Sequence, residues 1–118
     1  MSSTVYAITF DCGDAAELAE FWARVTDRKV DAGGSATFAS VGVQDEQPGA
    51  PRMMFFTVPE GKSAKNRLHL DLMTSDLDAE AERLVSCGAT RGAEFEEFGA
   101  HWITLTDPEG NEFDLVSG

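Results

Sequence analysis

Apolar and polar residues alternate along two stretches of the chain, residues 4–11 and residues 66–73. The alternating apolar positions are Tyr6, Ile8 and Phe10 in the first stretch and Leu68, Leu70 and Leu72 in the second. Successive side chains of a β-strand point to opposite faces of a sheet, so a period of two predicts a strand with one apolar face. We therefore expect one such strand in each half of the chain.

A helix is predicted directly after each of these strands. In the first half, Asp14 is followed by apolar residues at helical spacing, which predicts a helix over residues 15–25. In the second half, Ser75 and Asp78 have the spacing of a capping box, and Gly88 is suited to end the helix. The two halves therefore begin with the same strand and helix.

Three extended segments follow each predicted helix. They are residues 29–31, 37–42 and 52–58 in the first half and residues 89–93, 101–106 and 112–116 in the second. The helix caps Asp14 and Asp76 are separated by 76 − 14 = 62 residues, so the order of elements repeats along the chain. This order predicts two βαβββ modules, at about residues 4–60 and 66–118. Neither can bury both faces of its own sheet, so we expect them to pack together as a single α+β domain over residues 1–118.

Composition and charge narrow the range of partners. The 118 residues include 9 basic and 21 acidic side chains, a formal net charge of −12, which repels nucleic-acid phosphates and anionic membrane surfaces. No stretch approaches the roughly 20 apolar residues of a membrane helix, and the first residues lack a signal-peptide pattern. Cys12 and Cys87 lie far apart and lack metal-binding spacing, so no disulfide or zinc site is expected. These features predict a cytoplasmic protein without nucleic-acid or membrane partners.

The strand faces opposite the helices are free for another task, because only the apolar faces must lie under the helices. In the second half, polar and aromatic residues from three strands share this free face. They are Arg67, His69, Asp71, Trp102, Thr104, Glu112 and Asp114. A polar surface bordered by an aromatic ring is typical of a small-molecule site.

Three segments of the second half form a recognisable pattern: residues 66–72 (NRLHLDL), 83–89 (RLVSCGA) and 102–113, which contain DPEGNEF. Residues 19–22 (AEFW) add a weaker agreement in the first half. With these motifs the chain resembles the glyoxalase-like and bleomycin-resistance branch of the vicinal oxygen chelate superfamily. The resemblance implies two βαβββ modules that form a curled mixed sheet with the helices on its outer face. It also implies a concave cup for a small molecule and a homodimer.

The resemblance further implies where a metal would bind. Metal-dependent members place up to four ligands on the first and last strands of the two modules, around a divalent ion that chelates neighbouring substrate oxygens. In the second module these positions fall on His69 and Asp114, whereas in the first they fall on Ala7 and Phe56. Because three protein ligands are the usual minimum for zinc, we expect no metal or a weakly bound divalent metal.

Several roles remain open for these residues. His69 and Asp114 are metal ligands, an acid and base pair, or polar residues that line the cup; Asp71 or Asp114 would orient His69 as a general base. Arg67 either meets an anionic substrate or pairs with Asp71 or Glu112. Trp102 either stacks on a planar ligand or packs in the wall of the cup.

The leading hypothesis is a glyoxalase-like protein or lyase-like enzyme that binds a small molecule and has a degenerate metal site. The expected catalytic residues are His69 and Asp114, and the expected substrate-binding residues are Arg67, Asp71, Trp102, Thr104 and Phe56. The first alternative is a metal-dependent lyase, isomerase or dioxygenase whose other ligands come from elsewhere in the chain. The second is a bleomycin-type protein that sequesters a drug without chemistry.

Overall fold

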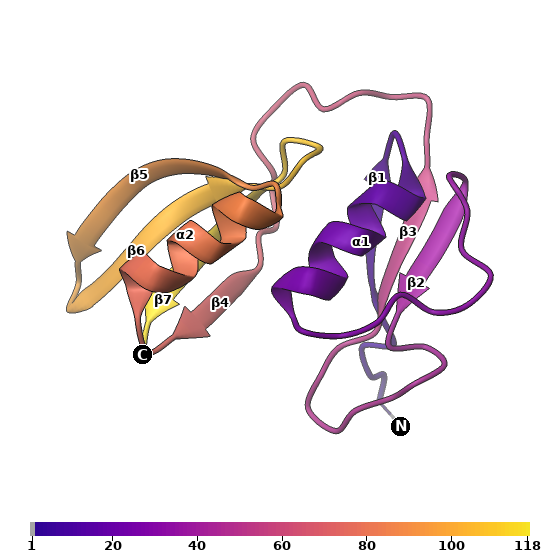
Figure 1. Ribbon diagram of the computed structural model, residues 1–118, viewed down its shortest axis with the longest axis horizontal. Coiled ribbons are helices and arrows are strands. Elements are labelled where there is room, and N and C mark those ends of the chain that lie inside the picture. Colours follow the sequence, from indigo (N-terminus) through magenta and orange to yellow (C-terminus); the bar gives the residue numbers. More distant parts are fainter. Residues whose placement is uncertain (1) are drawn as a thin grey trace. The chain divides into compact units, whose positions relative to one another are not determined.

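Each half of the chain contains one helix and its own mixed sheet in the computed structural model, which describes residues 2–118 (Figure 1). The chain divides into two units; the first ends at Gly61 and the second is Lys62–Gly118. The predicted modules, about residues 4–60 and 66–118, lie within these units. The chain therefore has the α+β class that the alternating and helical patterns predicted.

The first unit contains β1 (Ile8–Cys12), α1 (Ala15–Val25), β2 (Phe38–Val41) and β3 (Met53–Thr57). The strand order is β1-β3-β2, with β1 parallel and β2 antiparallel to β3. Helix α1 has the predicted bounds, because the Asp14 side chain accepts a hydrogen bond from the Glu17 N–H at 3.1 Å and so caps its first turn. Trp22 of this helix is buried, and its ring lies 5.3 Å from that of Phe10, which stacks on Phe55.

One predicted strand of the first unit is much shorter than expected. Instead of a strand over residues 29–31, the chain forms a single β-bridge between Val30 and Val41. The buried carboxylate of Asp31 accepts hydrogen bonds from the Ser40 hydroxyl at 2.6 Å and from the Val43 N–H at 3.0 Å. A side chain thus satisfies backbone and hydroxyl donors here, in place of a strand ladder.

The second unit contains β4 (Asp71–Thr74), α2 (Leu77–Cys87), β5 (Thr90–Glu97), β6 (Ala100–Thr106) and β7 (Glu112–Ser117). The strand order is β4-β7-β6-β5, with β4 parallel to β7 and the other pairs antiparallel. In both units the strand before the helix pairs with the last strand, which pairs in turn with the strand preceding it. The repeat inferred from the sequence is therefore a repeat of topology.

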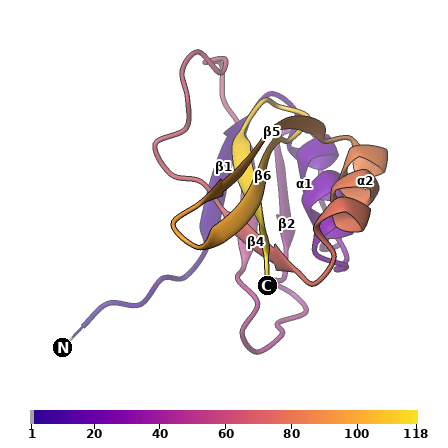
Figure 2. The ribbon, with the colours of Figure 1, turned by 90° about the vertical axis from the view of Figure 1, so that its left-hand side faces the viewer.

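Helix α2 covers one face of the second sheet (Figure 2). Its buried residues pack against the buried residues of β6 and β7, which are Ile103, Leu105, Phe113 and Leu115. The intervening residues of β6 and β7, among them Thr104 and Asp114, consequently point to the opposite face. We call this opposite face the open face of the second sheet.

Both strands that precede the helices begin later than the alternation predicted. β1 starts at Ile8 and β4 at Asp71, and two residues expected in the core are exposed, Tyr6 at 59% and Leu68 at 76%. Alternation along one segment says nothing about where its partner strand ends, and ladder pairing decides the length of a strand. Within residues 2–118, neither helix has the length and apolar character needed to cross a bilayer.

Candidate functional site

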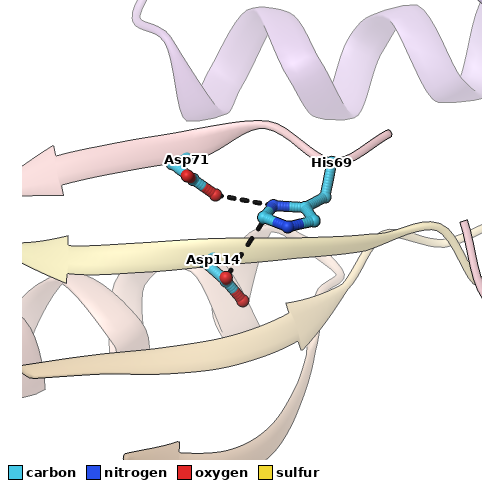
Figure 3. A group of neighbouring side chains, drawn as sticks. All are labelled: His69, Asp71 and Asp114. Carbon is cyan, nitrogen blue, oxygen red and sulfur yellow. Dashed lines mark hydrogen bonds and ion pairs between the residues drawn. The ribbon is translucent and has the colours of Figure 1, made fainter. Parts of the chain in front are cut away.

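Three ionisable side chains, those of His69, Asp71 and Asp114, meet on the open face of the second sheet (Figure 3). His69 Nδ1 lies 2.7 Å from Asp71 Oδ1, in a hydrogen bond, and 3.8 Å from Asp114 Oδ2. One ligand atom from each residue lies within 4.8 Å of the other two. We call these three residues the His–Asp–Asp cluster.

The sheet register brings the two carboxylates of the cluster together. Asp71 of β4 and Asp114 of β7 are directly paired in the parallel ladder, so both side chains leave the sheet on the same face. Like charges on paired strand positions repel one another. A positive charge between them, from a protonated histidine or a metal ion, would offset this repulsion.

A hydroxyl group from the neighbouring strand fixes Asp114. Thr104 of β6 is paired with Asp114 in the antiparallel ladder, and its Oγ1 donates a hydrogen bond to Asp114 Oδ1 at 2.7 Å. Thr104 and Asp114 are both half-buried, whereas Asp71 is exposed. The hydroxyl therefore leaves the other oxygen, Oδ2, directed toward His69.

His69 itself lies just before β4, on a segment that Glu112 anchors. Asp114 N–H donates to Leu70 O at 3.0 Å, and Asn66 N–H donates to Glu112 Oε1 at 2.9 Å. The N–H groups of Asn66 and of Glu112 itself, together with the Lys62 ammonium, lower the pKa of Glu112 to about 2. Glu112 is therefore ionised at neutral pH and holds the segment that leads to His69.

An aromatic pair stands beside the cluster on the same face. Trp102 of β6 stacks on Phe95 of β5 with ring centroids 5.3 Å apart and ring planes at 21°. Phe95 was not among the predicted site residues, because it lies in the acidic run from Glu94 to Glu97. The signal for it was the hairpin register: once Glu97 is paired with Ala100, Phe95 must lie opposite Trp102.

The structure brings some of the predicted site residues together and separates others. His69, Asp71, Thr104 and Asp114 form one connected group, with Trp102 on the same strand and face as Thr104. Arg67 is exposed, and the two acids proposed as its partners bind elsewhere, Asp71 to His69 and Glu112 to Lys62. Phe56 belongs to the first unit, where it is 40% exposed and its ring lies 4.8 Å from that of Phe38.

The donor set of the cluster suits a divalent cation. One imidazole nitrogen and two carboxylates supply three protein ligands, the usual number in a metal site that keeps a position open for substrate. Nitrogen and oxygen donors of this kind bind zinc, manganese, iron and nickel. Asp71 thus adds a third donor to the pair, His69 and Asp114, that the family pattern placed in this module.

The glyoxalase-like domain profile matches residues 7–116, and the chain belongs to this family. The second unit is a complete βαβββ unit, and the first has a single β-bridge in place of one strand, so the fold is the glyoxalase and bleomycin-resistance fold that the motifs predicted. No curated protein matches the chain in sequence.

Solved structures with this fold align over almost the whole chain. A glyoxalase/bleomycin resistance protein/dioxygenase family enzyme from Burkholderia phytofirmans has 17% identity and a TM-score of 0.78, with 98% of each chain covered. A fosfomycin resistance protein from Listeria monocytogenes, complexed with Mn(II) and dihydroxypropylphosphonic acid, has 14% identity and a TM-score of 0.77, covering 100% of this chain and 92% of its own. The bleomycin-binding protein of Streptomyces verticillus, complexed with copper(II)-bleomycin, has 19% identity and a TM-score of 0.65, covering 100% and 99%. At these identities the likeness establishes the fold.

Proposed function

We propose that the chain binds a small oxygen-bearing molecule on the open face of the second sheet, through a divalent ion held by His69, Asp71 and Asp114. The observation that carries this proposal is the convergence of three ligand atoms within 4.8 Å of one another. A divalent ion bound there would act as a Lewis acid toward the oxygens of the ligand. We expect weak binding of the ion, because the matching positions of the first module are Ala7 and Phe56.

The residues of the chain then have distinct roles in the proposed site. Asp71 and Asp114 supply the negative charge that attracts the ion, and Thr104 orients Asp114 through its hydroxyl group. His69 supplies the nitrogen ligand; without an ion, its hydrogen bond to Asp71 orients the ring as a general base. Trp102 and Arg67 are the proposed substrate-binding residues beside this group, and Phe56 has the same proposed role in the first unit.

Metal titration tests the proposal. We expect the full chain to bind one equivalent of Mn(II) or Ni(II) in calorimetry and its melting temperature to fall when a chelator is added. Asp71→Asn and Asp114→Asn should each weaken binding by at least about tenfold, because a neutral amide replaces a charged ligand. Glu97→Gln, at an exposed position of β5, is the matched control. The absence of saturable binding, or equal affinity in Asp71→Asn and the unaltered chain, would refute the proposal.

A second candidate function is sequestration of a planar cationic drug without chemistry. Two observations favour it: the stacked pair Phe95 and Trp102, and the net charge of −12. In that case an aromatic cation should bind with an affinity that a chelator does not change.

The remaining expectations also belong to the proposal. They are a single domain over residues 1–118, a cytoplasmic location and a homodimer. Light scattering at micromolar concentration tests the homodimer, and a monomer mass would contradict it.

A further inference from the structure

A row of apolar side chains crosses the open face of the second sheet beside the His–Asp–Asp cluster. The ladder pairs Met73 with Val116, Val116 with Trp102, and Trp102 with Phe95, so the four residues lie side by side across all four strands. Met73 is 78% exposed and Phe95 37% exposed, while Val116 and Trp102 are half-buried. We call these four residues the apolar row. Exposed apolar patches of this kind commonly mark a binding surface.

The apolar row adjoins the polar residues of the proposed site. The neighbouring row across β4, β7 and β6 consists of Asp71, Asp114 and Thr104. Asp71 and Asp114 come two residues before Met73 and Val116, and Thr104 comes two residues after Trp102 because β6 is antiparallel to β7. Two residues along a strand correspond to about 6.7 Å. A ligand that binds at the cluster and extends by about this distance along the strands also lies over the apolar row.

One face of the Trp102 ring is turned toward Val116. Phe95 stacks on the indole from the β5 side, with nearly parallel planes and centroids 5.3 Å apart. Because the stacking direction runs across the strands, the other indole face is turned toward β7, where Val116 is paired with Trp102. Trp102 and Val116 are both half-buried, so part of each side chain is accessible from the open face.

Met73 lies on the other side of Val116 and leans away from it. A Cβ atom added to Gly118 would collide with the Met73 side chain, so the thioether occupies the space above this glycine. Methionine is flexible and polarisable, which suits it to contact ligands of different outline. Val116 thus forms an apolar floor between an aromatic face and an adaptable side chain.

We propose that the ligand of this site carries a planar aromatic ring, which lies on Val116 against the side of Trp102 opposite Phe95 while its oxygen atoms reach the His–Asp–Asp cluster. The inference rests on the function proposed above and adds the class of ligand: an aromatic ring joined directly to a bidentate oxygen group. The spacing of about 6.7 Å between the rows suits a ring and an oxygen group without a long linker. Val116 is then a specificity-determining residue, because its size decides whether a ring fits.

Two hydroxamic acids with the same chelating group test this inference. Benzohydroxamate carries a phenyl ring where acetohydroxamate carries a methyl group, so the ratio of their affinities isolates the contribution of the ring. On the Ni(II)-loaded full chain we expect benzohydroxamate to bind about tenfold more tightly, through burial and stacking of the ring. Quenching of tryptophan fluorescence should accompany benzohydroxamate binding alone.

Variants at Val116 assign the preference to this position. Val116→Phe places a ring where the ligand ring should lie, so it should reduce the ratio of the two affinities to about one. Val116→Thr keeps the branched shape of the side chain and adds no ring, so it is the matched control, for which most of the preference should remain. Circular dichroism of each variant verifies that it folds.

The outcomes separate this inference from the proposed function. Equal affinities of the two hydroxamates on a metal-loaded chain would overturn the inference and leave metal binding intact. The absence of both metal and hydroxamate binding would overturn the proposed function and the inference with it. If Val116→Phe alters the oligomeric mass but leaves the affinity ratio unchanged, a second copy of the chain covers the apolar row and the inference is wrong.

Discussion

Replacement of Thr104 by valine tests whether one hydroxyl group organises the proposed site. Valine has nearly the shape of threonine but lacks the group that donates to Asp114 Oδ1 at 2.7 Å. A hydrogen bond to a charged group contributes about 1.5–3 kcal/mol, and the half-buried position favours the lower end. The higher strand propensity of valine offsets a few tenths of a kcal/mol. We therefore expect Thr104→Val to lower the free energy of unfolding by about 1 kcal/mol, or the melting temperature by about 4 °C.

The same substitution should weaken metal binding more than it weakens the fold. Groups that orient metal ligands typically contribute 10- to 100-fold in affinity, which corresponds to about 1.4–2.8 kcal/mol. Urea unfolding in the presence of a chelator measures the loss of stability, and calorimetric titration with Ni(II) measures the loss of metal affinity. The stability measurement needs no metal, so the role of the hydrogen bond in the fold is tested independently.

Thr104→Ser is the matched control, since serine keeps the hydroxyl group and loses only the methyl group. If the hydroxyl is responsible, the serine variant should bind Ni(II) nearly as well as the unaltered chain. If the serine variant is impaired and the valine variant is not, packing of the methyl group matters and the reasoning from the hydrogen bond is wrong.

Three further predictions concern the fold of the second unit. Leu84→Ala, at a fully buried position of α2, should lower the free energy of unfolding by about 2–5 kcal/mol, as measured by chemical unfolding. Val85→Ala, at a neighbouring position that is 45% exposed, should lower it by less than about 1 kcal/mol, and equal losses would contradict the assigned helix face. The pKa of Glu112 is about 2 in the folded chain and 4.5 ordinarily, so its contribution to stability is complete above pH 4.5 and is lost as the pH falls toward 2. Glu112→Gln should therefore lower the free energy of unfolding more at pH 7 than at pH 3, and a loss that is the same at both pH values would contradict this. Phe98 has a φ of 54° and is 95% exposed in the β5–β6 turn, a conformation that asparagine adopts more readily than phenylalanine. Phe98→Asn should therefore raise the free energy of unfolding by about 1 kcal/mol, and a lower melting temperature would show that the backbone at Phe98 is not strained.

Local signals in the sequence predicted the helices well. The cap at Asp14 and the helical spacing after it gave residues 15–25, which are the bounds of α1. Gly88 was expected to end the second helix, and its φ of 124° at the C-cap is a conformation that favours glycine. A cap and a period are properties of neighbouring residues, so a single sequence is enough to reveal them.

Contacts between distant residues were harder to predict. His69 and Asp71 are two residues apart, so alternation already placed them on one face. Asp114 joins them only through the register of β4 with β7, which pairs Asp71 with Asp114 and which alternation does not reveal. Phe95 was missed for a similar reason, since its position follows from the register of β5 with β6.

The acidic run along β5 has a consequence for solubility. β5 is the last strand of its sheet, and all its residues are exposed, including Glu94, Glu96 and Glu97. If two copies approached along this edge, each would bring the same three carboxylates, so their repulsion opposes strand-to-strand aggregation at neutral pH. The hydrogen bond from His101 lowers the pKa of Glu94, which keeps this carboxylate charged further into the acid range. Acidification is therefore the condition under which this edge becomes able to join other copies into extended sheets.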